Sequence, residues 1–120
     1  MKQKMLECQI QAWNRKPALR MLYVEWFHEI RSHLVPGITL EIGCGIGRLK
    51  KYIPGLFSVD IVKTPWTDVV GDAQELPFKA GNMSNLILFD VLHHLPRPLL
   101  FFFEALRILR NGGRVIIVEP

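Results

Sequence analysis

Three alternating glycines, with a glutamate just ahead of them, are the first residues whose types and spacing could do chemistry. They are Gly43, Gly45 and Gly47, and Glu41 stands two positions before the first glycine. Alternating glycines let a backbone turn tightly and approach a ligand closely, and a helix after such a turn offers free N–H groups. The segment 41–47 therefore predicts a ligand-binding turn, the plainer alternative being a simple connection between a strand and a helix.

The spacing of these glycines favours one ligand over another. A dinucleotide fingerprint has the form GxGxxG, whereas the third glycine here falls one position early at Gly47 and Arg48 takes the next position. The charge of Glu41 would oppose a pyrophosphate but would suit a ligand that carries an ammonium or a sulfonium group. Both features favour S-adenosylmethionine over NAD, with a nicotinamide-dependent oxidoreductase as the alternative from another enzyme class.

Two aspartates further along the chain could hold the nucleoside part of such a ligand. Asp60 stands 17 residues after Gly43 at the end of an apolar stretch, and its two adjacent acceptor oxygens suit the two hydroxyls of a ribose. Asp72 could accept a hydrogen bond from an adenine amino group, while Ala73 leaves room for the base. The alternative for Asp60 is an aspartate that caps a turn.

Helices that must position these residues follow from the hydrophobic pattern. Apolar residues at helical spacing predict a helix over 18–34, which Pro36-Gly37 ends. Further helices are expected over 48–52 and over 98–110, the last one terminated by Asn111-Gly112-Gly113.

Five short apolar stretches predict strands that alternate with these helices. The stretches are 38–42, 56–61, 69–72, 86–89 and 115–118. Those at 86–89 and 115–118 are apolar at every position, as expected of parallel strands covered on both faces. The alternation predicts an α/β fold with an open parallel sheet and right-handed crossovers. Ligands bind beyond the carboxyl ends of such strands, which is where the glycines and both aspartates fall.

Five motifs resemble, in order and at about the usual spacing, those of the methyltransferase type 11 group of class I S-adenosylmethionine-dependent methyltransferases. They are LEIGCGIG at 40–47, SVDI at 58–61, GDAQELPF at 71–78, FDVLHHL at 89–95 and LRILRNGGRVIIVEP at 106–120. The resemblance implies a Rossmann-like open parallel sheet in the order 3-2-1-4-5 with flanking helices. We expect an N-terminal helical segment over 1–36 and a cofactor-binding domain over 37–120.

The resemblance also assigns residues to S-adenosylmethionine. It places Glu41 near the methionine moiety, and it places Phe89 and Asp90 near the transferable methyl group. The residues implied for cofactor binding are Glu41, Gly43, Cys44, Gly45, Gly47, Asp60, Ile61, Asp72, Ala73, Phe89 and Asp90. The implied activity is methyl transfer to an acceptor that we expect to be a small molecule. A module that binds the cofactor without catalysis, or has lost it, is a further alternative.

Two features depart from the pattern of this group. Ser84-Asn85 stand where the group often has an acidic residue at the start of the fourth strand. The group's sheet also continues with a further helix and two more strands, whereas this sequence ends at Pro120 directly after an apolar stretch. Because an unpaired apolar edge is prone to association, we expect the natural protein to continue and the sheet here to be truncated before its last strands.

Histidines and aromatic residues supply the remaining candidates. His93 and His94 follow the fourth predicted strand, and a histidine could act as a general base near neutral pH. In the type 11 group, adjacent histidines at this place commonly pack or cap the following turn. The sequence therefore assigns no catalytic residue beyond these two candidates. Trp13, Trp26 and Phe27 form a helical stripe that indicates core, with a lid over the substrate as the alternative.

Composition excludes some classes of protein. Hydrophobic residues at 49% and charged residues at 22% are typical of a folded domain. The net charge of +4 is spread without a basic stripe, so nucleic-acid binding is possible but unsupported. Cys8 and Cys44 lack metal-ligand spacing, so no metal site is expected and Cys44 is expected to pack. Without a signal peptide or an apolar run longer than 99–103, we expect a cytoplasmic protein that does not enter a membrane.

Overall fold

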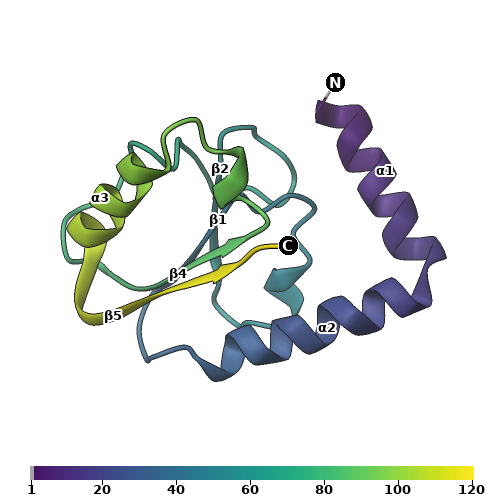
Figure 1. Ribbon diagram of the computed structural model, residues 1–120, viewed down its shortest axis with the longest axis horizontal. Helices are drawn as coiled ribbons and strands as arrows, with labels where there is room; N and C mark the ends of the chain where they lie inside the picture. Colours follow the sequence, from purple (N-terminus) through teal and green to yellow (C-terminus); the bar gives the residue numbers. More distant parts are fainter. Residues whose placement is uncertain (1) are drawn as a thin grey trace.

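A parallel sheet of five strands organises residues 2–120, the part of the chain that the computed structural model describes (Figure 1). The strands are β1 (Thr39–Ile42), β2 (Phe57–Asp60), β3 (Val69–Val70), β4 (Met83–Phe89) and β5 (Leu109–Val118). They lie in the order β3-β2-β1-β4-β5, and every neighbouring pair is parallel. The predicted fold class and strand order are therefore confirmed. Because β1 is central, the strands on both sides of it end beside the glycine turn.

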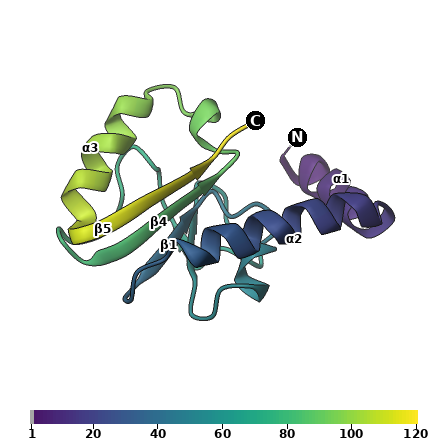
Figure 2. The ribbon, with the colours of Figure 1, turned by 60° about the horizontal axis from the view of Figure 1, so that its bottom comes forward.

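Three α-helices accompany the sheet within residues 2–120, namely α1 (Lys2–Arg15), α2 (Pro17–Ser32) and α3 (Pro98–Ile108). Helices α2 and α3 cover opposite faces of the sheet (Figure 2). Helix α1 turns back from α2 and stands at the side toward which the carboxyl end of β5 points (Figures 1 and 2). None of these helices is long and apolar enough to cross a membrane. The predicted division at 36/37 stays a prediction, and its first residue, Met1, lies outside the described residues.

Two hydrophobic cores follow from the alternation of side chains along the strands. Leu86 and Leu88 of β4 face the side covered by α3, where Phe101 is fully buried. Ile87, between them, faces the side covered by α2, where it packs in one core with Phe27. Both faces of the central strands are thus buried, which explains why β4 is apolar over 86–89 instead of alternating.

Strands and helices do not alternate at three connections, and the short helix predicted over 48–52 is wrong. The link from β1 to β2 contains only a 3₁₀ turn, Leu49–Lys51, where a helix was predicted over 48–52. Among the described residues, no helix links β2 to β3 or β3 to β4. The physical reason is local, because Pro54-Gly55, Pro65 and Pro77 interrupt connections that are already short. The carboxyl ends of these strands are consequently capped by loops.

The end of α3 also differs from the prediction. The helix ends at Ile108, and β5 begins at once with Leu109 opposite Met83. The pairing then jumps, so that Arg114 lies opposite Asn85. Asn111-Gly112-Gly113 therefore forms a bulge within β5 and does not terminate the helix. Gly112, in the left-handed region at φ +80°, allows the chain to turn there.

Asn85 joins the start of β4 to the chain segment that leads from α2 into β1. Its side chain is fully buried, its Oδ1 accepts from the Val35 N–H at 3.0 Å, and its Nδ2 donates to the Val35 carbonyl at 2.7 Å and to Thr39 Oγ1 at 3.0 Å. Ser84 Oγ accepts from Arg110 Nε at 2.8 Å. A carboxylate at position 85 could accept from the Val35 N–H but could not donate to the Val35 carbonyl.

We predict that Asn85→Ala lowers the free energy of unfolding by roughly 2–4 kcal/mol, because it removes a buried side chain and leaves the part-buried N–H and carbonyl of Val35 without these partners. Urea denaturation followed by circular dichroism measures the change. Asn82→Ala, at an exposed turn position, is the matched control. Equal effects of the two substitutions would contradict a structural role for the Asn85 side chain.

Candidate functional site

A cavity of about 790 Å³ opens at the carboxyl ends of the sheet strands, a size usual for small-molecule sites. Strand ends supply one part of its lining, while α1 and α2 supply another. The predicted residues that line it are Glu41, Gly43, Cys44, Gly45, Asp60, Ile61, Asp72, Ala73, Phe89, Asp90 and His94. The fold thus brings together residues from four strand ends. Gly47 and His93 are not part of the lining.

The glycine turn requires glycine at both of its ends, for different reasons. Gly43 has φ +77°, its N–H donates to the Val59 carbonyl at 2.8 Å, and a Cβ there would lie 2.5 Å from Val91. Gly47 has φ +69°, and a Cβ there would lie 2.4 Å from the Trp66 ring. Gly43 therefore shapes the cavity wall, whereas Gly47 packs against Trp66 behind the turn.

Glu41 is a buried carboxyl group at the end of β1. Its side chain is 5% exposed, and its Oε1 has no hydrogen-bond partner among the described residues. Burial, together with the neighbouring Asp60, raises the pKa of Glu41 to about 8, and Lys50 and the Ser58 hydroxyl oppose the rise. A buried carboxyl oxygen without a hydrogen-bond partner favours a ligand that is cationic or donates a hydrogen bond.

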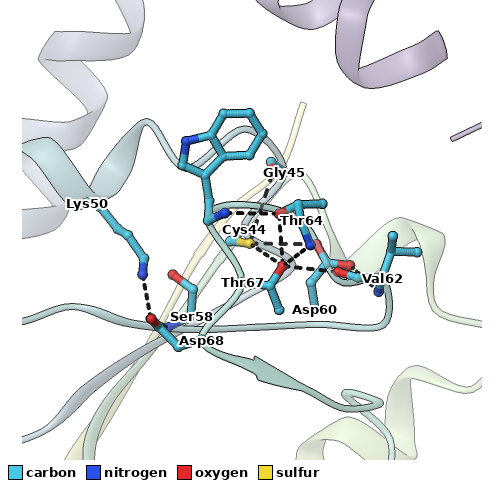
Figure 3. Close-up of polar contacts among 10 residues, drawn as sticks. Cys44, Gly45, Lys50, Ser58, Asp60, Val62, Thr64, Thr67 and Asp68 are labelled. Atoms are coloured by element: carbon cyan, nitrogen blue, oxygen red, sulfur yellow. Dashed lines mark hydrogen bonds and ion pairs between the residues drawn. The ribbon is translucent and has the colours of Figure 1, made fainter. Parts of the chain in front are cut away.

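Asp60 is the last residue of β2, the strand next to β1 on the side away from β4. Its Oδ1 accepts from the Val62 N–H at 3.1 Å, and the Cys44 thiol lies 3.9 Å from its Oδ2 (Figure 3). The same thiol lies 3.7 Å from Thr67 Oγ1. Burial raises the pKa of Cys44 to about 11, which keeps the thiol neutral and speaks against a nucleophile.

A second set of polar contacts holds the loop after β2. Lys50 Nζ pairs with Asp68, whose carboxylate also accepts from the Ser58 N–H at 2.9 Å (Figure 3). The hydrogen bond from Lys50 lowers the pKa of Asp68. Thr67 Oγ1 donates to the Val62 carbonyl at 3.0 Å and accepts from the Thr64 N–H at 3.1 Å. A loop at 64–66 was expected from the sequence, but these contacts were not, although Thr64 and Thr67 around Pro65 are a typical signal of a side-chain-stabilised turn.

The segment after β3 forms another polar corner of the cavity. Asp72 Oδ1 accepts from the Gln74 N–H at 2.8 Å, and Ala73 is buried beside it. Gln74 Oε1 accepts from the Arg97 N–H at 2.7 Å, which joins this corner to the loop that precedes α3. The small Ala73 side chain leaves the space next to Asp72 open.

Asp90 directly follows β4 in a strained backbone conformation. It has φ +55°, the one non-glycine residue with positive φ in the described chain, and its N–H donates to the Val118 carbonyl at 2.9 Å. Burial and then Glu119 raise the pKa of Asp90, and both histidines oppose the rise. His94 lines the cavity, whereas His93 pairs through Nδ1 with Glu119 outside it. The two predicted histidines therefore have different surroundings.

Aromatic side chains line the cavity on the side of the N-terminal helices. Trp13 of α1, Tyr23 and Phe27 of α2, and Phe89 at the end of β4 all contribute. Trp26, by contrast, packs its ring against Phe89 without lining the cavity. Sequence reasoning missed Tyr23, and the signal that could have found it is its position one helical turn before Phe27.

A family model described as a methyltransferase domain matches residues 40–117. An uncharacterized protein of Methanocaldococcus jannaschii is 29% identical over 114 residues, which cover 79% of this chain and 56% of that protein. The chloroplastic tocopherol O-methyltransferase of Arabidopsis thaliana is 25% identical over 101 residues, which cover 67% of this chain and 29% of the enzyme. The chain thus spans about half, or less, of the length of these relatives.

A solved structure from Methanococcus maripaludis shares the fold. That protein, ascribed to the S-adenosyl-L-methionine-dependent methyltransferases, superposes with a TM-score of 0.75 at 17% identity. The match covers 97% of this chain and 63% of the other. At this identity the likeness is one of fold.

The pKa of Glu41 yields a prediction for stability. The folded chain holds a proton on Glu41 up to about pH 8, whereas the unfolded chain releases it near pH 4.5, so the free energy of unfolding falls as pH rises between these values. Glu41→Gln removes the effect. We expect the variant to gain roughly 2–4 kcal/mol relative to the unmodified chain between pH 5 and pH 8.

Urea denaturation at pH 5, 6.5 and 8 measures this gain, with Glu75→Gln at an exposed position as the control. A stability difference between Glu41→Gln and the unmodified chain that stays constant over this range would contradict the prediction.

Proposed function

The chain belongs to the methyltransferase domain family whose model it matches over residues 40–117, and on this premise we propose that it transfers a methyl group from S-adenosylmethionine to a small-molecule acceptor. Membership of this family implies S-adenosylmethionine as the cofactor. A small acceptor is supported by tocopherol O-methyltransferase, a relative whose name gives a small molecule as its substrate. A cytoplasmic location stays a prediction.

The observation that carries the proposal is the buried Oε1 of Glu41, which has no hydrogen-bond partner among residues 2–120 and lies in the cavity wall. The methionine part of the cofactor carries an ammonium group, which donates several hydrogen bonds. Such a group would satisfy the orphaned oxygen and lower the cost of an ionised carboxylate there. The residues present therefore fit the cofactor.

The other strand ends would hold the nucleoside part. Asp60 faces the cavity at the end of β2, where its carboxylate could accept from ribose hydroxyls. Asp72 and the small, buried Ala73 flank the next corner, where an adenine would fit. Gly43 and Gly45 carry no side chain, so that a ligand could approach the backbone at these two positions of the turn.

The chain's own residues would act mainly by positioning. S-adenosylmethionine supplies an already electrophilic methyl group, so that alignment of the acceptor accounts for much of the rate. Phe89 and Asp90 would border the space in which the acceptor meets that methyl group. His94 lines the cavity and could take a proton from an acceptor that must lose one, whereas His93 is paired with Glu119.

Calorimetric titration of the chain with S-adenosylhomocysteine, NADH and a short RNA tests the proposal. We predict binding of S-adenosylhomocysteine alone. Asp60→Asn should weaken that binding about 10–100-fold, because it removes a charged acceptor for the ribose. Glu75→Gln, which lies outside the cavity lining, should leave the affinity unchanged.

Two results would contradict the proposal. Binding of NADH in preference to S-adenosylhomocysteine would favour the nicotinamide-dependent oxidoreductase, and absence of S-adenosylhomocysteine binding would favour a module without this cofactor. Thermal unfolding of Asp60→Asn separates a loss of affinity from a loss of fold, since Asp60 also accepts from Val62.

A further inference from the structure

The cavity has two chemically different sides. The ends of β1 and β2 and the turn after β3 contribute carboxyl groups and glycines, which the proposed cofactor would occupy. The opposite side, from α1, α2 and the end of β4, is lined by rings. We define the aromatic wall as Trp13, Tyr23, Phe27 and Phe89.

Contacts among these rings make the aromatic wall continuous. The Tyr23 and Phe89 ring centroids lie 5.3 Å apart, and those of Phe27 and Phe89 lie 5.8 Å apart. Trp13 stacks on Phe27 at 6.3 Å with 27° between the ring planes. Rings held in this way present a large apolar surface at little cost in side-chain entropy. A flat apolar molecule is therefore the ligand that the wall would bury best.

Charged groups around the wall argue against a charged acceptor. Asp90 and Asp60 line the same cavity and would repel an anion. The Arg48 guanidinium also lines the cavity, lies 5.1 Å from the centroid of the Trp13 ring and would repel a cation at the wall. A neutral molecule avoids both kinds of repulsion.

Two polar groups interrupt the wall at one end. Tyr23 packs on Phe89, the residue that precedes Asp90, and both Tyr23 and Asp90 line the cavity. Burial and then the Asp90 carboxylate raise the pKa of the Tyr23 hydroxyl. The backbone of Asp90, at φ +55°, sets the direction of its side chain at this end of the wall. The carboxylate can only accept, and the phenol can both donate and accept. A ligand hydroxyl at this end would therefore find an acceptor and a donor.

We propose that the acceptor is a neutral, planar and largely apolar molecule whose hydroxyl group binds between Tyr23 and Asp90 while its body packs on the aromatic wall. This inference rests on the proposed function and specifies its substrate class. Trp13 and Tyr23 are then specificity-determining residues. Trp26 lies outside the cavity lining and is not one of them.

Binding of 1-naphthol to the chain saturated with S-adenosylhomocysteine tests the substrate class. Calorimetry compares 1-naphthol with 1-naphthoate and with 1-naphthylmethylammonium, which keep the ring system and add a negative or a positive charge. We expect 1-naphthol to bind at least about fivefold more tightly than either charged analogue. Equal or tighter binding of a charged analogue, or no binding of 1-naphthol, would overturn the proposal.

Substitutions test whether 1-naphthol binds at the aromatic wall. Trp13→Ala should weaken 1-naphthol binding about tenfold, and Tyr23→Phe should weaken 1-naphthol about fivefold while leaving naphthalene unaffected, because only the hydroxyl contact is lost. Phe103→Ala is the control, since Phe103 is 66% exposed on α3 and lies outside the cavity lining. Circular dichroism verifies that each variant is folded.

The outcomes separate the two proposals. If S-adenosylhomocysteine does not bind to the unmodified chain, the proposed function fails. If it binds but Trp13→Ala affects 1-naphthol no more than Phe103→Ala does, or if Tyr23→Phe weakens naphthalene as much as 1-naphthol, the acceptor site fails and the cofactor site stands.

Discussion

A carboxyl group buried at the end of the central strand is the constraint on which the rest of the site depends. Glu41 has β2 on one side and β4 on the other, so it cannot reach bulk water. Lys50, the cation that opposes the rise in its pKa, pairs directly with Asp68. The chain thus keeps an acidic group uncompensated at the point where four strand ends converge. That arrangement costs stability in the empty protein and becomes favourable once a cationic ligand binds.

Side-chain hydrogen bonds far apart in the sequence hold the strand ends around Glu41. Asn85 joins the start of β4 to the segment before β1. The pairs made by Asp68 and by Thr67 shape the loop after β2, and Gln74 links the turn after β3 to the loop before α3. The sheet sets the direction of each strand end, while these contacts set where the loops stand. The cavity is therefore a product of loop contacts as much as of strand order.

Much of the fold and of the candidate site was predictable from the sequence, because wholly apolar stretches and a glycine turn are local signals. The short helix expected over 48–52 was not found, since Pro54-Gly55 interrupts that link, whereas the helix expected over 98–110 is present as α3. The role of Gly47 was out of reach, because its contact with Trp66 depends on how a distant loop folds. That Glu41 Oε1 has no hydrogen-bond partner could not be predicted from the sequence either, because it depends on Lys50 pairing with Asp68 in the folded chain.

The most direct test of the role of Glu41 is the titration of its carboxyl carbon by NMR, with and without S-adenosylhomocysteine. We expect a pKa of about 8 for Glu41 in the free chain. We expect a clearly lower pKa in the complex, because the ligand ammonium favours the carboxylate. A pKa near 4.5 in the free chain, or one that the ligand leaves unchanged, would contradict this role.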